Sequence, residues 1–125
     1  MQEAIDFKNG DRECKLLFNI RTLKDFEQEL GYSLNLLFTQ NLTLTLRLTT
    51  INFTRLGIKY GLQDKKSEDA DEYDFIQRYC DNGGSLDTLN AFILAAIDAT
   101  NLFTEGQTTP LEEIRKVLEN AKAEA

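Results

Sequence analysis

Apolar positions recur at helical spacing over residues 85–103, the most strongly patterned segment of the chain. At about 100° per residue, one broad face carries Leu89, Phe92, Ile93, Ala96, Ala99, Thr100 and Phe103. A narrow opposite stripe carries Asp87, Asn90, Asp98 and Asn101. Because so thin a polar stripe does not suit a helix that lies on a surface, we expect this segment to be the core helix. Leu94 interrupts the polar stripe.

Residues 1–19 show the alternating pattern of a β-hairpin. Asn9-Gly10 is a favoured type I′ turn, which predicts that Phe7 faces Arg12 and Ile5 faces Cys14. One face of the ribbon is then apolar and carries Ile5, Phe7, Cys14, Leu16 and Phe18. The other carries Asp6, Lys8, Asp11, Glu13 and Lys15. A lone two-stranded ribbon is marginal in water, so its apolar face should pack on helices.

Two short helices are expected after the hairpin. The first begins with a threonine cap at Thr22, buries Leu23, Phe26 and Leu30, and ends at Gly31. The second begins at Ser33 and points Leu34, Leu37 and Phe38 inward. Packing and capping account for both segments, and neither carries a chemical group beyond those needs.

Residues 41–62 give the most ambiguous pattern. Leu42 to Leu48 alternates like a strand, whereas helical spacing prevails from Leu48 onward, and we interpret the segment as a helix. Projected as one helix it is apolar on two opposite sides, the second carrying Leu44, Leu48, Ile51, Ile58 and Leu62. Such a helix is either sandwiched inside the domain or buries one side against another chain. Gly57 and Gly61 either weaken its last turns or permit close approach to a neighbour.

The rest of the chain alternates between loops and helices. Residues 63–71 form a charged, solvated loop, and the helix over 72–82 should bury Tyr73, Ile76, Tyr79 and Cys80. Thr108-Thr109-Pro110 begins a last helix that reaches about residue 121, and 122–125 is a frayed tail. The sequence therefore predicts a single domain over residues 1–125. Its class is mainly α (α+β): an N-terminal hairpin packed on a bundle of about five or six helices, in segments 22–62 and 72–121.

Composition narrows the classes of function. The chain has 125 residues and a net charge of −7, which argues against a nucleic-acid or anionic-membrane surface. No apolar run approaches the length of a membrane span, and the N-terminus lacks the pattern of a signal peptide. Cys14 and Cys80 lie far apart and fit no ligand spacing, so we interpret them as reduced, buried thiols of a cytosolic protein, with a disulfide as the second alternative.

Enzyme chemistry has little support in the sequence. Histidine is absent, which removes the commonest general base and metal ligand at neutral pH, and there is no glycine-rich phosphate loop. An EF-hand alignment that begins at Asp69 fails at Tyr73, Asp74 and Cys80. We therefore expect no catalytic residues, no metal and no cofactor.

Apolar side chains in unexpected places are the remaining signal. Either a compact domain covers them, or they bind an amphipathic helix of a partner or another copy of the chain. The candidate contact residues are Leu44, Leu48, Ile51, Leu94 and Leu102. If they form a surface, charge substitutions at Leu94 and Leu102 should abolish partner binding and leave folding intact.

The order of these elements resembles a known family. The hairpin with Asn9-Gly10 leads into the segment LLFNI at 16–20, and LKDFEQELGYSL follows at 23–34. A leucine-rich segment, a polar loop, a helix pair and a charged tail complete the pattern. Over nearly its full length the chain resembles the short form of the tail assembly chaperones of long-tailed bacteriophages and prophages. The alternating stretch 42–48 departs from the family's helical pattern.

The resemblance implies a non-enzymatic assembly factor. Such proteins bind and solubilise the long, helical tape measure protein, and they promote polymerisation of the tail tube protein. It also implies a homo-oligomer in the cytoplasm of the host bacterium that is absent from the mature virion. Two alternatives stay open: a structural component such as a head-tail connector or tail terminator, and a small acidic adaptor that binds a host protein.

Overall fold

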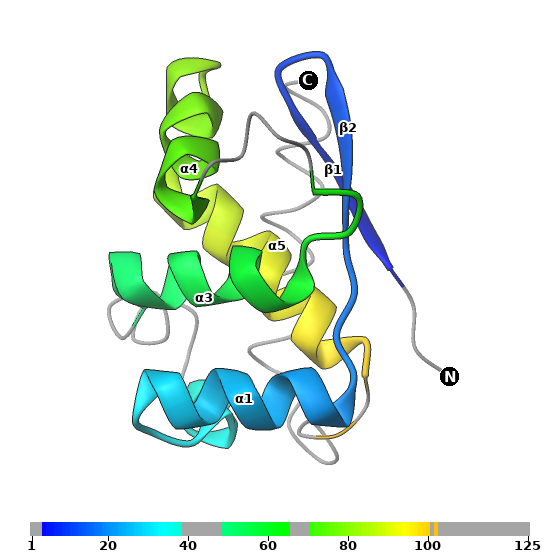
Figure 1. Ribbon diagram of the computed structural model, residues 1–125, viewed down its shortest axis with the longest axis vertical. Helices are drawn as coiled ribbons and strands as arrows, with labels where there is room; N and C mark the ends of the chain where they lie inside the picture. The colour runs from blue at the N-terminus through cyan, green and yellow to red at the C-terminus, as the bar shows by residue number, and fades with distance from the viewer. Residues whose placement is uncertain (1–3, 39–48, 66–70, 101, 103–125) are drawn as a thin grey trace.

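The computed structural model describes residues 4–38, 49–65, 71–100 and 102 (Figure 1). The elements within these ranges are β1 (Ile5–Asn9), β2 (Arg12–Leu16), α1 (Ile20–Leu30), the 3-10 helix η1 (Leu34–Phe38), α3 (Ile51–Gly61), α4 (Glu72–Asp81) and α5 (Leu86–Asp98). The predicted class, mainly α with an N-terminal β-hairpin, is confirmed. The described part holds four α-helices, fewer than the five or six expected, and the helix predicted after Thr108 lies outside it.

Helix α3 is the central element of the described part. It packs against α1 on one side and against α5 and α4 on others, and the hairpin lies beside the carboxyl end of α3 and against α5 (Figure 1). Phe53 and Leu56 on the first apolar side are fully buried. Ile58 and Leu62 on the second apolar side are nearly so. Over these residues the helix is therefore sandwiched within the domain, as one of the two alternatives anticipated.

Two glycines allow the close packing around α3. A Cβ at Gly57 would lie 2.6 Å from the side chain of Ile93 on α5, and one at Gly61 would contact the Phe18 ring. The Phe18 ring in turn lies 5.8 Å from that of Phe26 on α1. The close-approach alternative for these glycines is the one that the structure supports.

The hairpin has the predicted faces and a different register. Its loop is Gly10-Asp11, with Phe7 opposite Cys14 and Ile5 opposite Leu16, so the turn expected at Asn9-Gly10 is wrong by one residue. Gly10, with a φ of 65°, holds the first central position, where glycine is favoured in type II′ turns. Burial of Asn9 also favours this loop position, because the Asn9 side-chain amide donates to the carbonyl of Phe75 over 3.2 Å and so cannot lie in an exposed turn.

The chain after α3 returns to the hairpin. Leu17 N donates to the Gly61 carbonyl over 2.9 Å, and Gln63 N donates to the Lys15 carbonyl over 3.0 Å. Gln63, expected in the solvated loop 63–71, therefore pairs with the outer edge of β2. Of the rest of that loop, residues 66–70 lie outside the described ranges.

Three helix boundaries differ from the prediction. The helix expected over 41–62 begins only at Ile51, because Thr50 is extended and caps it, its side chain accepting from the N–H of Phe53. Residues 41–48 of that prediction lie outside the described ranges.

Helix α1 begins after Asn19, whose side chain accepts from the N–H of Thr22, while the Thr22 hydroxyl accepts from the N–H of Asn19. Thr22, which was predicted as the cap, is thus the N3 residue of a capping box whose N-cap is Asn19. Helix α5 follows its cap Ser85 as expected but ends at Asp98 rather than at residue 103. Gly31 ends α1 in the left-handed conformation, as expected.

Helix α4 is rotated relative to the prediction. Phe75, Ile76 and Tyr79 are buried, whereas Tyr73 is about half exposed and Cys80 is partly exposed. Phe75 is buried because its ring meets that of Phe7 edge-on at 6.1 Å. None of the described helices combines the length and the apolar character that crossing a bilayer requires.

Candidate functional site

Exposed apolar side chains and a groove are the candidate features among the described residues. Among these residues, no three histidine, cysteine or acidic side chains are placed to hold a metal ion. Neither described cysteine forms a disulfide; Cys14 lies in the core and Cys80 lies at its margin.

The structure divides the predicted contact residues. Ile51 is 55% exposed as the first residue of α3, and Leu102 is 47% exposed beyond the end of α5. Leu94 is fully buried in the hydrophobic core, so the interpretation of Leu94 as a surface residue is wrong. Leu44 and Leu48 lie outside the described residues. Ile51 and Leu102 are thus the described candidates that remain.

The stripe of α5 that was predicted to be polar is buried inside the domain around Leu94. One turn before it, Asn90 is 3% exposed; its side-chain oxygen accepts from the Thr54 hydroxyl over 2.6 Å, and its amide donates to the Thr49 hydroxyl over 3.2 Å. A buried amide with both ends paired is stable in a core. The sequence pattern placed Asn90 in water because its partners on and before α3 are distant in the chain.

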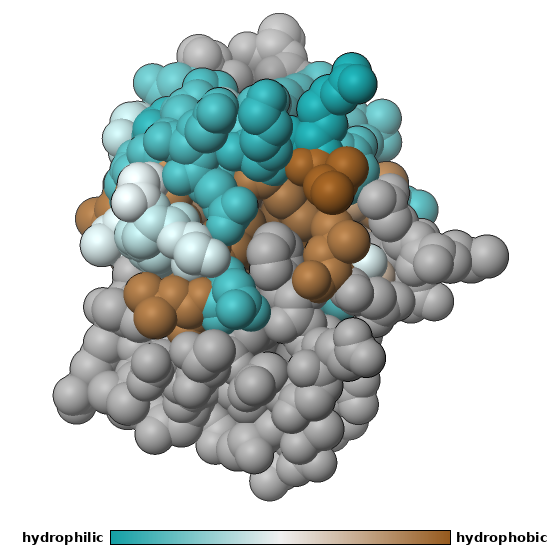
Figure 2. Space-filling view, turned by 90° about the horizontal axis from the view of Figure 1, so that it is seen from below, coloured by the Kyte–Doolittle hydropathy of each residue, from teal (hydrophilic) through white to brown (hydrophobic). Residues whose placement is uncertain are grey.

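Three exposed apolar side chains were missed by the sequence analysis. Ile20 is the most exposed of them at 71%, and Leu36 and Tyr73 are about half exposed. Ile20 was missed because the cap was predicted at Thr22, which left Ile20 outside the helix. With Asn19 as the cap, Ile20 is the first residue of α1 and lies before the residues that face the core. Figure 2 views the molecule from the side of α1, and hydrophobic residues reach the surface there among hydrophilic ones.

A charged network links α1, α3 and α4. Glu29 accepts a hydrogen bond from Lys59 Nζ at 2.8 Å and another from the Tyr60 hydroxyl. Arg55 lies 3.7 Å from Glu29 and 3.6 Å from Glu72. The Lys59 bond, followed by the Tyr60 bond, lowers the pKa of Glu29, and the bond to Glu29 raises the pKa of both partners. We assign this network a structural role, since it links helices.

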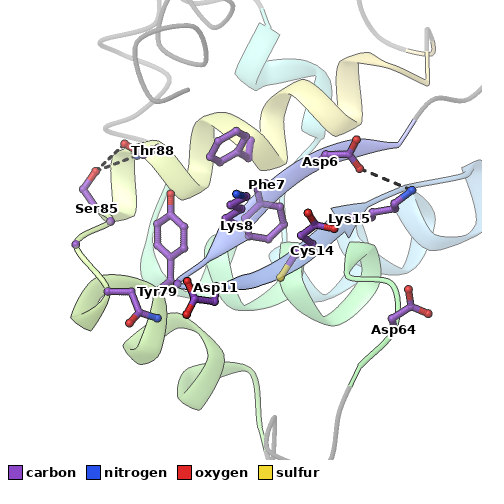
Figure 3. A pocket seen from close by; sticks show the side chains of 16 residues that line it. Asp6, Phe7, Lys8, Asp11, Cys14, Lys15, Asp64, Tyr79, Ser85 and Thr88 are labelled. Carbon is purple, nitrogen blue, oxygen red and sulfur yellow. Dashed lines mark hydrogen bonds and ion pairs between the residues drawn. The ribbon is translucent and has the colours of Figure 1, made fainter. Parts of the chain in front are cut away.

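A groove runs between the hairpin and the turn that joins α4 to α5 (Figure 3). Its floor is apolar: the Phe7 ring stacks on that of Phe92 at a centroid distance of 5.4 Å and meets Tyr79 edge-on at 6.2 Å. Burial, aided by the neighbouring Cys80, raises the pKa of Tyr79 to about 12, so its phenol is neutral. The rim is charged with both signs and is made by Asp6, Lys8, Asp11, Glu13, Lys15 and Asp64.

The groove has charged side chains of both signs at its rim, and the three aromatic rings of its floor, Phe7, Phe92 and Tyr79, are each at most 6% exposed. Comparisons of this chain with protein-family models, with curated proteins and with solved structures give no match.

Proposed function

We propose that this chain is a non-enzymatic tail assembly chaperone of a long-tailed bacteriophage or prophage. In this proposal it binds and solubilises the helical tape measure protein and promotes polymerisation of the tail tube. It acts in the host cytoplasm and is absent from the finished virion. The resemblance of the sequence suggests the family, and the observation that supports a binding role is the exposure of Ile20, Ile51 and Leu102 on an acidic protein.

The physical basis is transfer of apolar surface. An amphipathic client helix exposes a stripe of apolar residues, and each apolar side chain removed from water contributes about 1.5–3 kcal/mol when burial is complete. Ile20, Ile51 and Leu102 are exposed in the free chain, so a client can cover them without unfolding any described element. A client that covers these side chains only in part makes weak contacts with each copy of the chain. Several copies bound to one client can together give firm binding.

Weak individual contacts also permit release. A chaperone of this kind must give up its client when tube subunits compete for the same helix, and the competition is decided by relative affinity. After release, the apolar contact residues of the chaperone are uncovered again. Mutual repulsion from the net charge of −7 keeps such molecules in solution.

Co-purification tests the proposal. The chain is expressed together with the tape measure protein of the same genome, and Ile51→Asp and Leu102→Asp are compared with Gln28→Asp, which adds the same charge at an exposed polar position of α1. We expect both apolar variants to lose the client and the control to retain it, with unchanged circular dichroism in all. Equal recovery of client by every variant would exclude Ile51 and Leu102 as contact residues.

Analysis of purified particles separates the alternatives. A head-tail connector or tail terminator stays in the virion and is found there by mass spectrometry, whereas a chaperone is absent. A host-directed adaptor is also absent from the particle, but it would recover a host protein and leave the tape measure protein insoluble.

A further inference from the structure

One edge of the hairpin is unpaired among the described residues. In a two-residue loop the flanking residues Asn9 and Arg12 exchange both backbone bonds, and the bonded pairs then alternate along the ladder. The backbone groups of Phe7 and Ile5 therefore point toward β2, and those of Asp6 and Lys8 point away from it. The other edge obeys the same alternation, because Lys15 uses its outward carbonyl to accept from Gln63.

The free edge has the length for a short strand pairing. No described residue makes a backbone hydrogen bond to Asp6 or Lys8 on this side. Both residues are exposed, and they line the groove described above. Residues 61–63 already pair with the outer edge of β2 at Lys15 and Leu17, so β1 offers the longer free edge.

Charge decides which strand fits. For two copies of β1 paired antiparallel about a two-fold axis, only three registers bring the outward groups together. One places Asp6 opposite Asp6 of the second copy, and another places Lys8 opposite Lys8, and both are repulsive. The third is centred on Phe7 and places each Asp6 opposite Lys8 of the other copy. It forms four backbone hydrogen bonds and two pairs of opposite charge.

We propose that a second copy of this chain pairs with β1 in the register centred on Phe7, which joins the two hairpins into one continuous sheet. Charged residues at a strand edge often prevent such pairing, particularly lysine. Here the strand carries one charge of each sign around its centre, so the same two residues that repel other registers favour this one. The proposal rests on the strand alone and can hold or fail independently of the client.

The charge relation gives a test with matched variants. The first variant, Asp6→Lys with Lys15→Asp, and the second, Lys8→Glu with Glu13→Lys, each keep opposite charges across the hairpin and leave the net charge unchanged. In the first, lysine faces lysine between copies, and in the second, acid faces acid. Mixed together, the two variants place opposite charges at every intermolecular pair.

Sedimentation of the full chain over a range of concentrations measures the result. We expect the natural chain to form dimers, each variant alone to dimerise at least about tenfold more weakly, and the equimolar mixture to recover dimers. Circular dichroism checks that both variants fold. A natural chain that stays monomeric, variants that associate as the natural chain does, or a mixture that fails to recover would each overturn the proposal.

Hydrogen exchange of the natural chain gives a second readout that needs no variant. The amide protons of Asp6 and Lys8 should become protected as the concentration rises and exchange quickly on dilution. Protection at these two amides that does not change with concentration would contradict pairing between copies.

Discussion

Replacing Leu94 by alanine separates the core role that the structure gives this residue from the contact role that its place in the polar stripe suggested. Leu94 is fully buried, so truncation removes apolar surface from the core and leaves a cavity. Such Leu→Ala changes cost about 2.7–5 kcal/mol, and a loss of about 3 kcal/mol lowers the Tm of a chain of this size by roughly 10 °C. Leu94→Asp should not fold, because it buries an unpaired charge.

Urea unfolding followed by circular dichroism measures this cost, with Leu102→Ala as the matched control. Leu102 is 47% exposed, and its truncation should cost less than about 1 kcal/mol. The reasoning would be refuted if the two alanine variants lost similar stability, or if Leu94→Ala lost less than about 1 kcal/mol. Either result would return Leu94 to the contact surface.

Three further predictions concern the packing and the charge network. Gly61→Ala should lower the free energy of unfolding by about 1–3 kcal/mol, because its Cβ meets the Phe18 ring, and adding Phe18→Leu should restore part of the loss. Thr54→Val should cost about 1–3 kcal/mol, since it leaves the buried Asn90 oxygen without its donor; both losses are measured by urea unfolding. Glu29 has a lowered pKa, so the stabilisation that it contributes is present above its usual pKa of 4.5 and is lost as the pH falls through the lowered value. The Tm of Glu29→Gln, measured against pH, should therefore fall less on acidification than the Tm of the natural chain.

The hairpin shows what alternation can predict. The expected partner of Phe7 was Arg12, and the observed partner is Cys14, two residues further along β2. A shift of two keeps every side chain on its face, so the apolar and charged faces were correct although the register was not. The loop position depended on the burial of Asn9 against α4, which no local pattern contains.

The helices show where local patterns reach their limit. The two apolar sides of α3 were visible in the sequence, but their cause, packing between α1 and α5, is a tertiary arrangement. Asn90 and Leu94 were assigned to a solvent-facing stripe because nothing in the sequence of α5 indicates that Thr54 pairs with the Asn90 amide. Polar residues that are satisfied by distant partners therefore gave the largest error in the candidate site.

The missed surface residues have a local cause. Asn19 and Thr22 both favour a helix N-cap, and choosing the later one hid Ile20. A search for reciprocal caps would have found Asn19, since a capping box needs a side chain at each end. Exposure of Ile51 follows from its place as the first residue after the Thr50 cap.

The yield of soluble tape measure protein during co-expression tests the central claim most directly. The account predicts that the client remains in the soluble fraction with the natural chain and precipitates with a chain carrying Ile20→Asp, Ile51→Asp and Leu102→Asp together. The triple variant must itself remain folded and soluble for the comparison. A client that is equally soluble with either chain, or insoluble with both, would contradict the account.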